Sequence, residues 1–384
     1  MNQAIPVFRT FVPESARARA TAALARGWLG YGPECRELER HFTGKHGGFA
    51  LATSTCTSAL HLAAQLLRRR TQRREVIVPA ITFVSTAMAF HHAGFRVRVA
   101  DVESRSLLLS AQSVARLVSA DTAAIVAVHL YGQWCASLPA LRRLCDAGGA
   151  VLIEDCAHRV DLLDDEPPLG DYACYSFNAV KEVPCGEGGL LWGRDVTDEA
   201  ATRAVSNVGL GIDTMQRAAR LRHADYQFTT ESGLKLRLND LAASLVNGGL
   251  ESLAVSRSRR AAQFARYDDL LAPLAPRVRP LKRTDGDACL MYVVHVPAPQ
   301  RDSIRAHLAE RGVASSVHYP SLARHPLFRD SADSPMNFDV DDTLITLPSF
   351  PEMTREEQCA VADALATASE CVDASAGAGR LAFD

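Results

Sequence analysis

One lysine of this 384-residue chain stands in a segment where an amine could do chemistry. Lys181 lies in the stretch 175–189, which Pro184 and several glycines make too irregular for a helix, directly before the apolar run 190–192. Such a segment can present an amine to a cleft instead of to solvent. A desolvated amine loses its proton more easily and can form a Schiff base with a carbonyl compound. By itself, a lysine in this position is more often a solvated surface residue. Other features of the sequence must therefore decide between a surface lysine and a reactive one.

A second candidate for chemistry is the hydroxyl-rich turn at 53–58. It follows an apolar strand expected at 49–52 and precedes a helical pattern at 59–67. Backbone N–H groups and the positive end of the helix dipole converge at such a turn and can bind a phosphate or another anion. A plain Ser/Thr cap of the helix is the more common explanation of this pattern.

A carboxylate and an imidazole follow a third apolar run. Asp155 closes the nearly continuous apolar strand expected at 150–155, and His158 comes three residues later. The carboxylate could cap the next turn, which is the usual role, or could be held for a cationic partner. His158 is similarly ambiguous when taken alone.

The elements that must position these residues alternate between strand and helix patterns. Strands are expected at 75–79, 96–101, 123–129 and 190–192, and helices at 15–27, 34–46, 82–92 and 138–147. This alternation predicts an α/β fold with a large, doubly wound, mostly parallel sheet. Ligands of such sheets bind beyond the carboxyl ends of the strands, which is where the turn at 55–58, Asp155 and His158 fall.

The second half of the chain predicts a smaller C-terminal α/β domain. A long helix is expected from Asn239 to about Ala272, and the domain boundary is placed along it, giving a large domain at 1–245 and a small one at 246–384. Strands at 291–296 and 314–319 and a helix at 301–311 are expected in the small domain. The Ala- and Gly-rich tail from about residue 373 is expected to be disordered.

Composition excludes several classes of partner. A formal net charge of −2 gives no global field for nucleic acid or an anionic membrane, and no apolar run is long enough to span a bilayer. The N-terminus shows no signal peptide. The ten cysteines are scattered and form no C-x-x-C pair, which favours reduced thiols in a cytoplasmic protein and no metal site.

Four features taken in order match the needs of pyridoxal 5'-phosphate. Its phosphate needs the helix N-terminus at 55–58, and its ring needs a flat apolar face, for which Phe83 is the candidate. Its ring nitrogen needs a carboxylate such as Asp155, and its aldehyde needs an amine such as Lys181.

The chain resembles the DegT/DnrJ/StrS family of pyridoxal-phosphate aminotransferases, which aminate keto sugars and related cyclitols in antibiotic and cell-surface biosynthesis. The resemblance covers roughly residues 5–365. It rests on six ordered motifs: Thr55–Leu60, Glu75–Phe83, Val128–Gln133, Ile153–His158, Ser176-Phe177 with Lys181 and Gly186–Gly189, and Val317–Pro320.

The resemblance implies a role for each matching residue. Lys181 would form the Schiff base with the cofactor and move the proton, and Asp155 would pair with the pyridinium nitrogen. The other expected cofactor contacts are His158 at the ring hydroxyl, Phe83 stacked on the ring, and Cys56, Thr57 and Ser176 at the phosphate. His318 and Tyr319 match a segment near the cleft, where a structural role and substrate contact are equally expected. The family also implies a fold-type I homodimer with active sites at the subunit interface.

Some motifs depart from the family pattern. Thr55-Cys56-Thr57 stands where the family commonly has Asn-Gly-Thr. Lys235 stands where a family Asn reaches the partner subunit's phosphate, and Leu234 and Leu236 replace aromatics. The segment 206–209 keeps only part of an Arg-Asn-His-Gly motif. These departures predict an atypical acceptor.

The expected reaction is a two-stage transamination. L-Glutamate or L-glutamine would donate the amino group, pyridoxamine phosphate would carry it, and a keto sugar, nucleotide-linked in the commonest case, would accept it. A keto-cyclitol or another ketone is an alternative acceptor. A cofactor-binding regulator without turnover is the alternative of another class, and intact Lys181, Asp155 and Ser176 argue against it.

Overall fold

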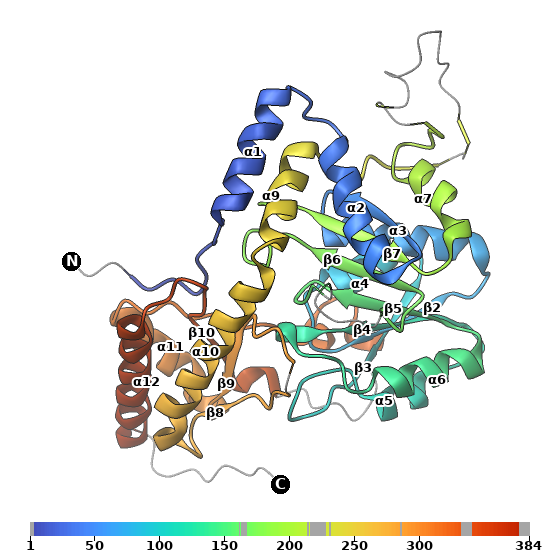
Figure 1. Ribbon diagram of the computed structural model, residues 1–384. Coiled ribbons are helices and arrows are strands. Elements are labelled where there is room, and N and C mark those ends of the chain that lie inside the picture. The colour runs from blue at the N-terminus through green and yellow to red at the C-terminus, as the bar shows by residue number, and fades with distance from the viewer. Residues whose placement is uncertain are drawn as a thin grey trace.

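The computed structural model describes residues 4–160, 162, 167–212, 215, 228–229, 232–284, 286–331 and 340–375. Its centre is a seven-stranded sheet covered by helices on both faces, and a second, three-stranded sheet lies beside it (Figure 1). The apolar runs of the sequence thus become strands buried on both faces, as a covered parallel sheet requires. In the described part of the chain, no helix has the length and apolar character that a membrane span needs.

The large sheet is mostly parallel. Its strands are β1 (Phe49–Thr53), β2 (Glu75–Pro79), β3 (Arg96–Ala100), β4 (Thr122–Val128), β5 (Val151–Cys156), β6 (Tyr172–Ser176) and β7 (Gly189–Gly193), in the order β1-β7-β6-β5-β4-β2-β3. The pairs from β3 to β6 are parallel, whereas β7 runs antiparallel to both β1 and β6. The predicted α/β class with a doubly wound, mostly parallel sheet is confirmed.

Helices cover the sheet in two layers. The helices of the larger unit are α1 (Glu14–Arg26), α2 (Pro33–His46), α3 (Cys56–Arg70), α4 (Ser85–His92), α5 (Ala111–Leu117), α6 (Leu138–Gly148), α7 (Glu199–Val205) and α9 (Asp240–Leu250). The helices α3 and α4 share one core cluster with the sheet. On the opposite face, α5 and α6 pack on β2 to β5, and α2 and α9 pack on β1, β6 and β7. Both faces are therefore withdrawn from water, and only the strand ends stay open for a site.

The smaller unit is built on the antiparallel sheet β10-β9-β8. Its elements are β8 (Arg279–Pro280), β9 (Tyr292–His295), β10 (Leu344–Leu347), α10 (Leu253–Leu271), α11 (Arg301–Glu310) and α12 (Arg355–Ser375). Their apolar side chains form one cluster of their own. The N-terminal segment joins this unit, because Ile5 forms a bridge with Val313.

Three details of the C-terminal half differ from expectation. The single helix expected at 239–272 is two helices, because the chain turns at Glu251 and Ser252 between α9 and α10. The strand expected at 314–319 is only a bridge between Ser316 and Thr346, after which the backbone leaves the sheet toward the cleft. The tail expected to be disordered from about 373 still belongs to α12 as far as Ser375, and residues 376–384 lie outside the described residues.

Gly189 fixes how closely the lysine segment approaches helix α3. A Cβ atom at this position would lie 2.4 Å from the carbonyl carbon of Thr55 and 2.5 Å from the backbone nitrogen of Cys56. Atoms of the backbone cannot move aside as a flexible side chain can. Only glycine therefore lets β7 pass against the N-terminus of α3.

We expect Gly189→Ala to destabilise the protein by about 1–3 kcal/mol, because the added methyl group overpacks a backbone contact. Thermal unfolding measures the loss as a lower midpoint. Gly44→Ala is the matched control, since Gly44 lies within α2 with open space around it and alanine favours a helix. Equal midpoints for the two variants would show that α3 and β7 are not in this close contact.

Candidate active site

The N-terminus of α3 opens at the carboxyl end of β1. Thr55 is its N-cap, and the Thr55 Oγ1 accepts a hydrogen bond of 2.9 Å from the backbone N–H of Ser58. Cys56 and Thr57 begin the helix, where backbone N–H groups have no partner within the helix. The cap and the anion site proposed for this turn are thus compatible, because capping occupies the N–H of Ser58 and leaves those of Cys56 and Thr57.

Ser176 lies next to this helix end. It is the last residue of β6 and pairs with Gly189, the residue that contacts the backbone of Thr55 and Cys56. Its side chain is nearly buried, at 7% exposure. The structure therefore brings the three residues expected at the phosphate, Cys56, Thr57 and Ser176, to one place.

Asp155 is a buried carboxylate at the end of β5. Its Oδ2 accepts a hydrogen bond of 2.8 Å from Thr86 Oγ1, and its Oδ1 accepts one of 3.0 Å from the backbone N–H of Ala157. The Cys56 thiol lies 3.8 Å from Oδ1. Burial raises the pKa of Asp155, and the hydrogen bonds from Thr86 and Ala157 and the charge of Lys181 partly offset that rise.

Lys181 sits in a closed loop between β6 and β7. Backbone hydrogen bonds of 2.8 Å from Phe177 to Gly188 and from Ala179 to Gly186 hold the two arms of the loop together. In the described part of the chain, no side chain or carbonyl accepts a hydrogen bond from the Lys181 amine.

The environment of this amine favours its neutral form. Burial lowers the pKa of Lys181 to about 8, and the opposing influences are the thiol of Cys56 and the carboxyl groups of Asp155 and Glu187. These interactions also place the amine beside the carboxyl end of β5 and the start of α3. The irregular segment recognised in the sequence thus presents its amine to the interior.

His158 connects the two units. The backbone N–H of Tyr131 donates to His158 Nδ1 at 3.0 Å, and the Tyr319 hydroxyl lies 3.2 Å from His158 Nε2. Burial holds the pKa of His158 well below its usual value, and the charges of Lys181 and His318 act in the same direction. The imidazole is therefore neutral, and because Nδ1 accepts, the proton is on Nε2, which donates to Tyr319.

Aromatic side chains line the open side of the site. Phe83 is 53% exposed, unusually high for an aromatic residue in the sheet unit, and its ring centroid lies 5.7 Å from that of Tyr319. His318 Nδ1 lies 2.8 Å from Thr346 Oγ1, and burial lowers the pKa of His318 to about 4. The segment 318–319 therefore reaches the site from the smaller unit.

Lys235 lies apart from this group. Its amine donates a 2.8 Å hydrogen bond to Asn207 Oδ1, and the two residues also form an antiparallel bridge. The backbone of the same segment runs beside β1, because the N–H of Ser54 donates to the carbonyl of Leu236 at 2.7 Å. The two segments that depart most from the family pattern, 206–209 and 233–237, thus pack against each other.

Three contributors to the site were given no role in the sequence analysis. Thr86 holds Asp155 and itself lies 2.9 Å from the hydroxyl of Thr82, Tyr131 holds His158, and Gly189 shapes the end of α3. Thr82 and Thr86 are four residues apart, a spacing that places both hydroxyls on one helical face and was available in the sequence. The residue that Thr86 contacts, Asp155, could not be identified from the sequence.

A buried cluster of potential metal ligands lies behind Asp155, formed by His129, Glu154 and Cys156. His129 Nε2 lies 2.8 Å from Glu154 Oε2, and His129 Nδ1 accepts a hydrogen bond of 3.2 Å from the backbone N–H of Cys135. The second Glu154 oxygen accepts from the backbone N–H of Gly170. The ring and the carboxylate are both engaged, so the cluster is a hydrogen-bond network that joins β4 to β5.

The site residues fit pyridoxal phosphate on these observations. Free N–H groups at a helix start suit a phosphate, a buried carboxylate suits a protonated ring nitrogen, and an unpaired, half-buried amine suits an aldehyde. Phe83 adds an exposed apolar face beside them.

Comparisons with known proteins agree with this arrangement. The sequence model of the DegT/DnrJ/EryC1/StrS aminotransferase family matches residues 12–366. The aminotransferase TlmJ from Streptoalloteichus hindustanus is 26% identical with a TM-score of 0.85, and 96% of this chain and 100% of that chain are covered. AtS13 from Actinomadura melliaura is also 26% identical, with a TM-score of 0.82 and coverage of 95% and 99%.

A third similar structure is Spr1654 from Streptococcus pneumoniae, described as a sugar aminotransferase and solved in PMP and PLP forms. Its PMP form is 24% identical, with a TM-score of 0.85 and coverage of 96% of this chain and 100% of that chain. The fold is that of fold-type I enzymes, and pyridoxal phosphate is the cofactor. The chain belongs to the DegT/DnrJ/EryC1/StrS aminotransferase family and is a pyridoxal-phosphate-dependent aminotransferase.

Proposed function

We propose that this enzyme transfers an amino group from L-glutamate or L-glutamine to the keto group of a sugar, with a nucleotide-linked keto sugar as the first candidate acceptor. The family supports the reaction class, and the description of Spr1654 as a sugar aminotransferase supports the acceptor class. A keto-cyclitol is the second acceptor to test. The substitutions at 233–237 support an acceptor that differs from the family's common one.

The observation that carries the proposal is the half-buried Lys181 side chain, whose amine has its pKa lowered to about 8 by desolvation. An amine that is partly neutral near pH 7.5 can both attack a carbonyl carbon and accept a proton. Pyridoxal phosphate supplies an aldehyde and an electron-accepting ring when it is bound. The Lys181 Nζ then takes a proton from the α-carbon of the amino donor and returns it later in the reaction.

The other residues of the site would orient the bound cofactor and polarise its ring. The Asp155 carboxylate, held by Thr86 and Ala157, would pair with the ring nitrogen of the bound cofactor and favour its protonated form. The N–H groups of Cys56 and Thr57, with the Ser176 hydroxyl, hold the phosphate. His158 would offer a neutral imidazole to the ring hydroxyl, and Phe83 would supply an apolar surface for the ring.

The functional unit we propose is a homodimer with shared active sites, in which Lys235 contacts the phosphate bound by the partner subunit. The 2.8 Å contact with Asn207 Oδ1 keeps the Lys235 side chain in a defined position from which such a contact could be made. We propose a large domain at 1–245 and a small domain at 246–384, with the boundary near the junction between α9, which packs on the large unit, and α10, which packs on the small one.

The proposal predicts that glutamate or glutamine converts the bound cofactor and bleaches its visible absorbance band. The converted enzyme, offered a panel of nucleotide-linked keto sugars, unlinked keto sugars and keto-cyclitols, regains the band with its true acceptor. Lys181→Ala lacks the lysine-dependent band and turnover, whereas Lys282→Ala, which removes an exposed lysine, retains both. A band that persists with every amino donor would instead indicate a regulator without turnover.

A pKa near 8 for Lys181 is directly measurable, because the chain has only four lysines, at 45, 181, 235 and 282. Carbon-13 labelling of the lysine Cε atoms in the cofactor-free protein gives one signal for each. The Lys181 signal should titrate near pH 8, with the ammonium form below this pH and the free amine above it. The Lys181→Ala variant assigns the signal, because the Lys181 resonance is missing from its spectrum. A Lys181 midpoint above 10 would contradict the proposed environment.

Asp155→Asn should lower turnover roughly 100-fold, equivalent to about 2.7 kcal/mol, while the protein still binds cofactor, because a neutral ring nitrogen is a poorer electron acceptor. Thr86→Val keeps the carboxylate and removes one of its hydrogen bonds, so a smaller loss of roughly tenfold is expected. Steady-state kinetics and cofactor absorbance measure the two effects separately. Near-normal turnover in Asp155→Asn would defeat the role assigned to this residue.

A further inference from the structure

The Tyr319 hydroxyl reaches the active site from the smaller unit. It lies 3.2 Å from His158 Nε2, and the Tyr319 ring centroid lies 5.7 Å from that of Phe83. Among the described residues, His158 is the only hydrogen-bond partner of this hydroxyl. Tyr319 thus stands between the residue expected at the ring hydroxyl of the cofactor and the residue expected on the face of the ring.

A backbone group fixes the direction of the hydrogen bonds around His158. The backbone N–H of Tyr131 can only donate, so His158 Nδ1 accepts its hydrogen bond of 3.0 Å. In the neutral imidazole the proton is then on Nε2, and this N–H donates to the Tyr319 oxygen. The Tyr319 hydroxyl has thus accepted a hydrogen bond and still has its own proton to donate. No described residue accepts that proton.

Two hydrogen bonds to the larger unit hold the segment that carries Tyr319. The Tyr131 hydroxyl donates to the carbonyl of His318, and the backbone N–H of Leu322 donates to the carbonyl of Ala80 at 2.8 Å. The backbone of Tyr131 also fixes the proton of the neighbouring imidazole. This one residue therefore positions both sides of the hydrogen bond that Tyr319 makes.

The backbone of Tyr131 adopts a left-handed conformation, with φ 62° and ψ 7°. This conformation is unfavourable for a residue with a Cβ atom and persists where surrounding contacts enforce it. The N–H groups of Leu290 and Met291 donate to the Tyr131 carbonyl at 3.1 Å and 3.4 Å. Contacts from the smaller unit thus hold Tyr131 in the orientation in which its own N–H meets His158.

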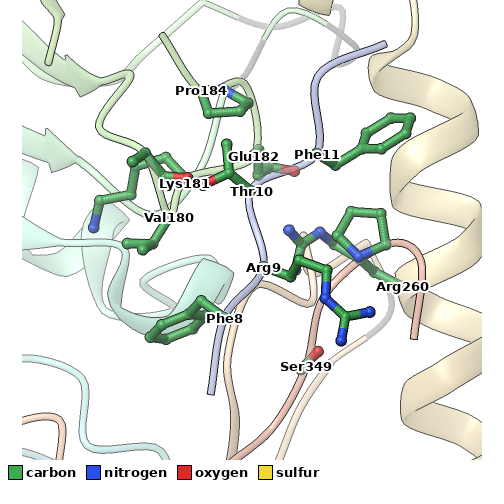
Figure 2. Close-up of a pocket in the computed structure, with 12 residues that line it drawn as sticks. Phe8, Arg9, Thr10, Phe11, Val180, Lys181, Glu182, Pro184, Arg260 and Ser349 are labelled. Carbon is green, nitrogen blue, oxygen red and sulfur yellow. Dashed lines mark hydrogen bonds between the residues drawn. The ribbon is translucent and has the colours of Figure 1, made fainter. Parts of the chain in front are cut away.

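The Lys181 amine reaches the same space from the lysine loop. Figure 2 shows this amine pointing away from Arg260 and helix α10. Burial lowers the pKa of His158 and of His318, and the charge of Lys181 acts on both in the same direction. The amine and the two imidazoles therefore adjoin one region, and the Tyr319 hydroxyl lies at its edge.

An oxygen atom of a bound ligand beside His158 Nε2 would accept the remaining proton of Tyr319. The ring hydroxyl of pyridoxal phosphate is assigned to that nitrogen, an assignment that rests on the function proposed above. Because the Tyr319 oxygen lies 3.2 Å from the same nitrogen, a ring oxygen bound there is within its reach. Two donors that converge on one oxygen stabilise negative charge on it.

We propose that the Tyr319 hydroxyl donates a hydrogen bond to the ring oxygen of bound pyridoxal phosphate, beside the contact of His158, and that Tyr131 positions it. Tyr319 is a cofactor-contacting residue, whereas Tyr131 acts through its neighbours. The ring oxygen neighbours the aldehyde carbon to which Lys181 bonds. A donor at this oxygen draws negative charge away from the Lys181 nitrogen, which then holds its proton less strongly.

The visible absorbance band of the holoenzyme tests this contact, because the pH at which the band changes reports the proton on the Lys181 nitrogen. Tyr319→Phe removes the hydroxyl and keeps the ring, so this pH midpoint should rise by roughly one unit. An unchanged midpoint in a Tyr319→Phe protein whose band still bleaches with glutamate or glutamine would overturn the proposal. A parent protein without the lysine-dependent band would contradict the proposed function and, with it, this contact. A holoenzyme crystal structure with the Tyr319 oxygen beyond hydrogen-bond distance of the ring oxygen would also overturn it.

Tyr131→Phe tests the positioning role, because it removes the hydrogen bond to the His318 carbonyl and keeps the backbone N–H. The midpoint should rise by a smaller amount, and the double variant with Tyr319→Phe should shift no further than Tyr319→Phe alone. Tyr267→Phe is the matched control, since it removes a buried hydroxyl that donates to the Pro348 carbonyl at 2.9 Å within the smaller unit, and the midpoint should not move. Additive shifts of Tyr131→Phe and Tyr319→Phe, or an equal shift in the control, would contradict the role given to Tyr131.

Discussion

The burial of one amine is the constraint on which the rest of this structure depends. Removing an ammonium group from water costs free energy, which is reduced when the amine loses its proton. The protein keeps Lys181 inside by closing its loop with backbone hydrogen bonds between the two arms and by placing the loop between β6 and β7. Asp155 and Cys56 face the amine without forming a hydrogen bond to it. The amine therefore remains available to a carbonyl compound.

The parallel sheet explains how distant segments reach this amine. Strands β1 and β5 deliver the start of α3 and Asp155 to the same edge, since the carboxyl ends of parallel strands and the turns that follow them lie together. The antiparallel strand β7 then returns the chain past β6 and β1, so that Gly189 lies against the turn at Thr55. The lysine loop is thus held at the edge of the sheet where the phosphate-binding turn begins.

The smaller unit completes the site. Tyr319 reaches His158 across the cleft, and its ring lies beside Phe83. On the other side of the lysine loop, Arg257 of α10 pairs with Glu182, and Arg260 of α10 lines a small pocket together with residues 179–182 of the loop. Both sides of the loop are therefore contacted by the C-terminal half of the chain, which couples the position of the reactive amine to the packing of the two units.

The sequence by itself determined the α/β class, the order of the site motifs and the family, because apolar runs, turn residues and reactive side chains are local features. Lys181 and Asp155 were recognisable as candidates since each adjoins an apolar strand. The contacts of Thr86 with Asp155 and of Tyr131 with His158 join residues 69 and 27 positions apart, and no local pattern encodes them. The break between α9 and α10, and the unpaired donors of Arg260 and Ser349, likewise follow from packing. Tertiary structure alone decided these features, because burial and long-range contact exist only once the chain has folded.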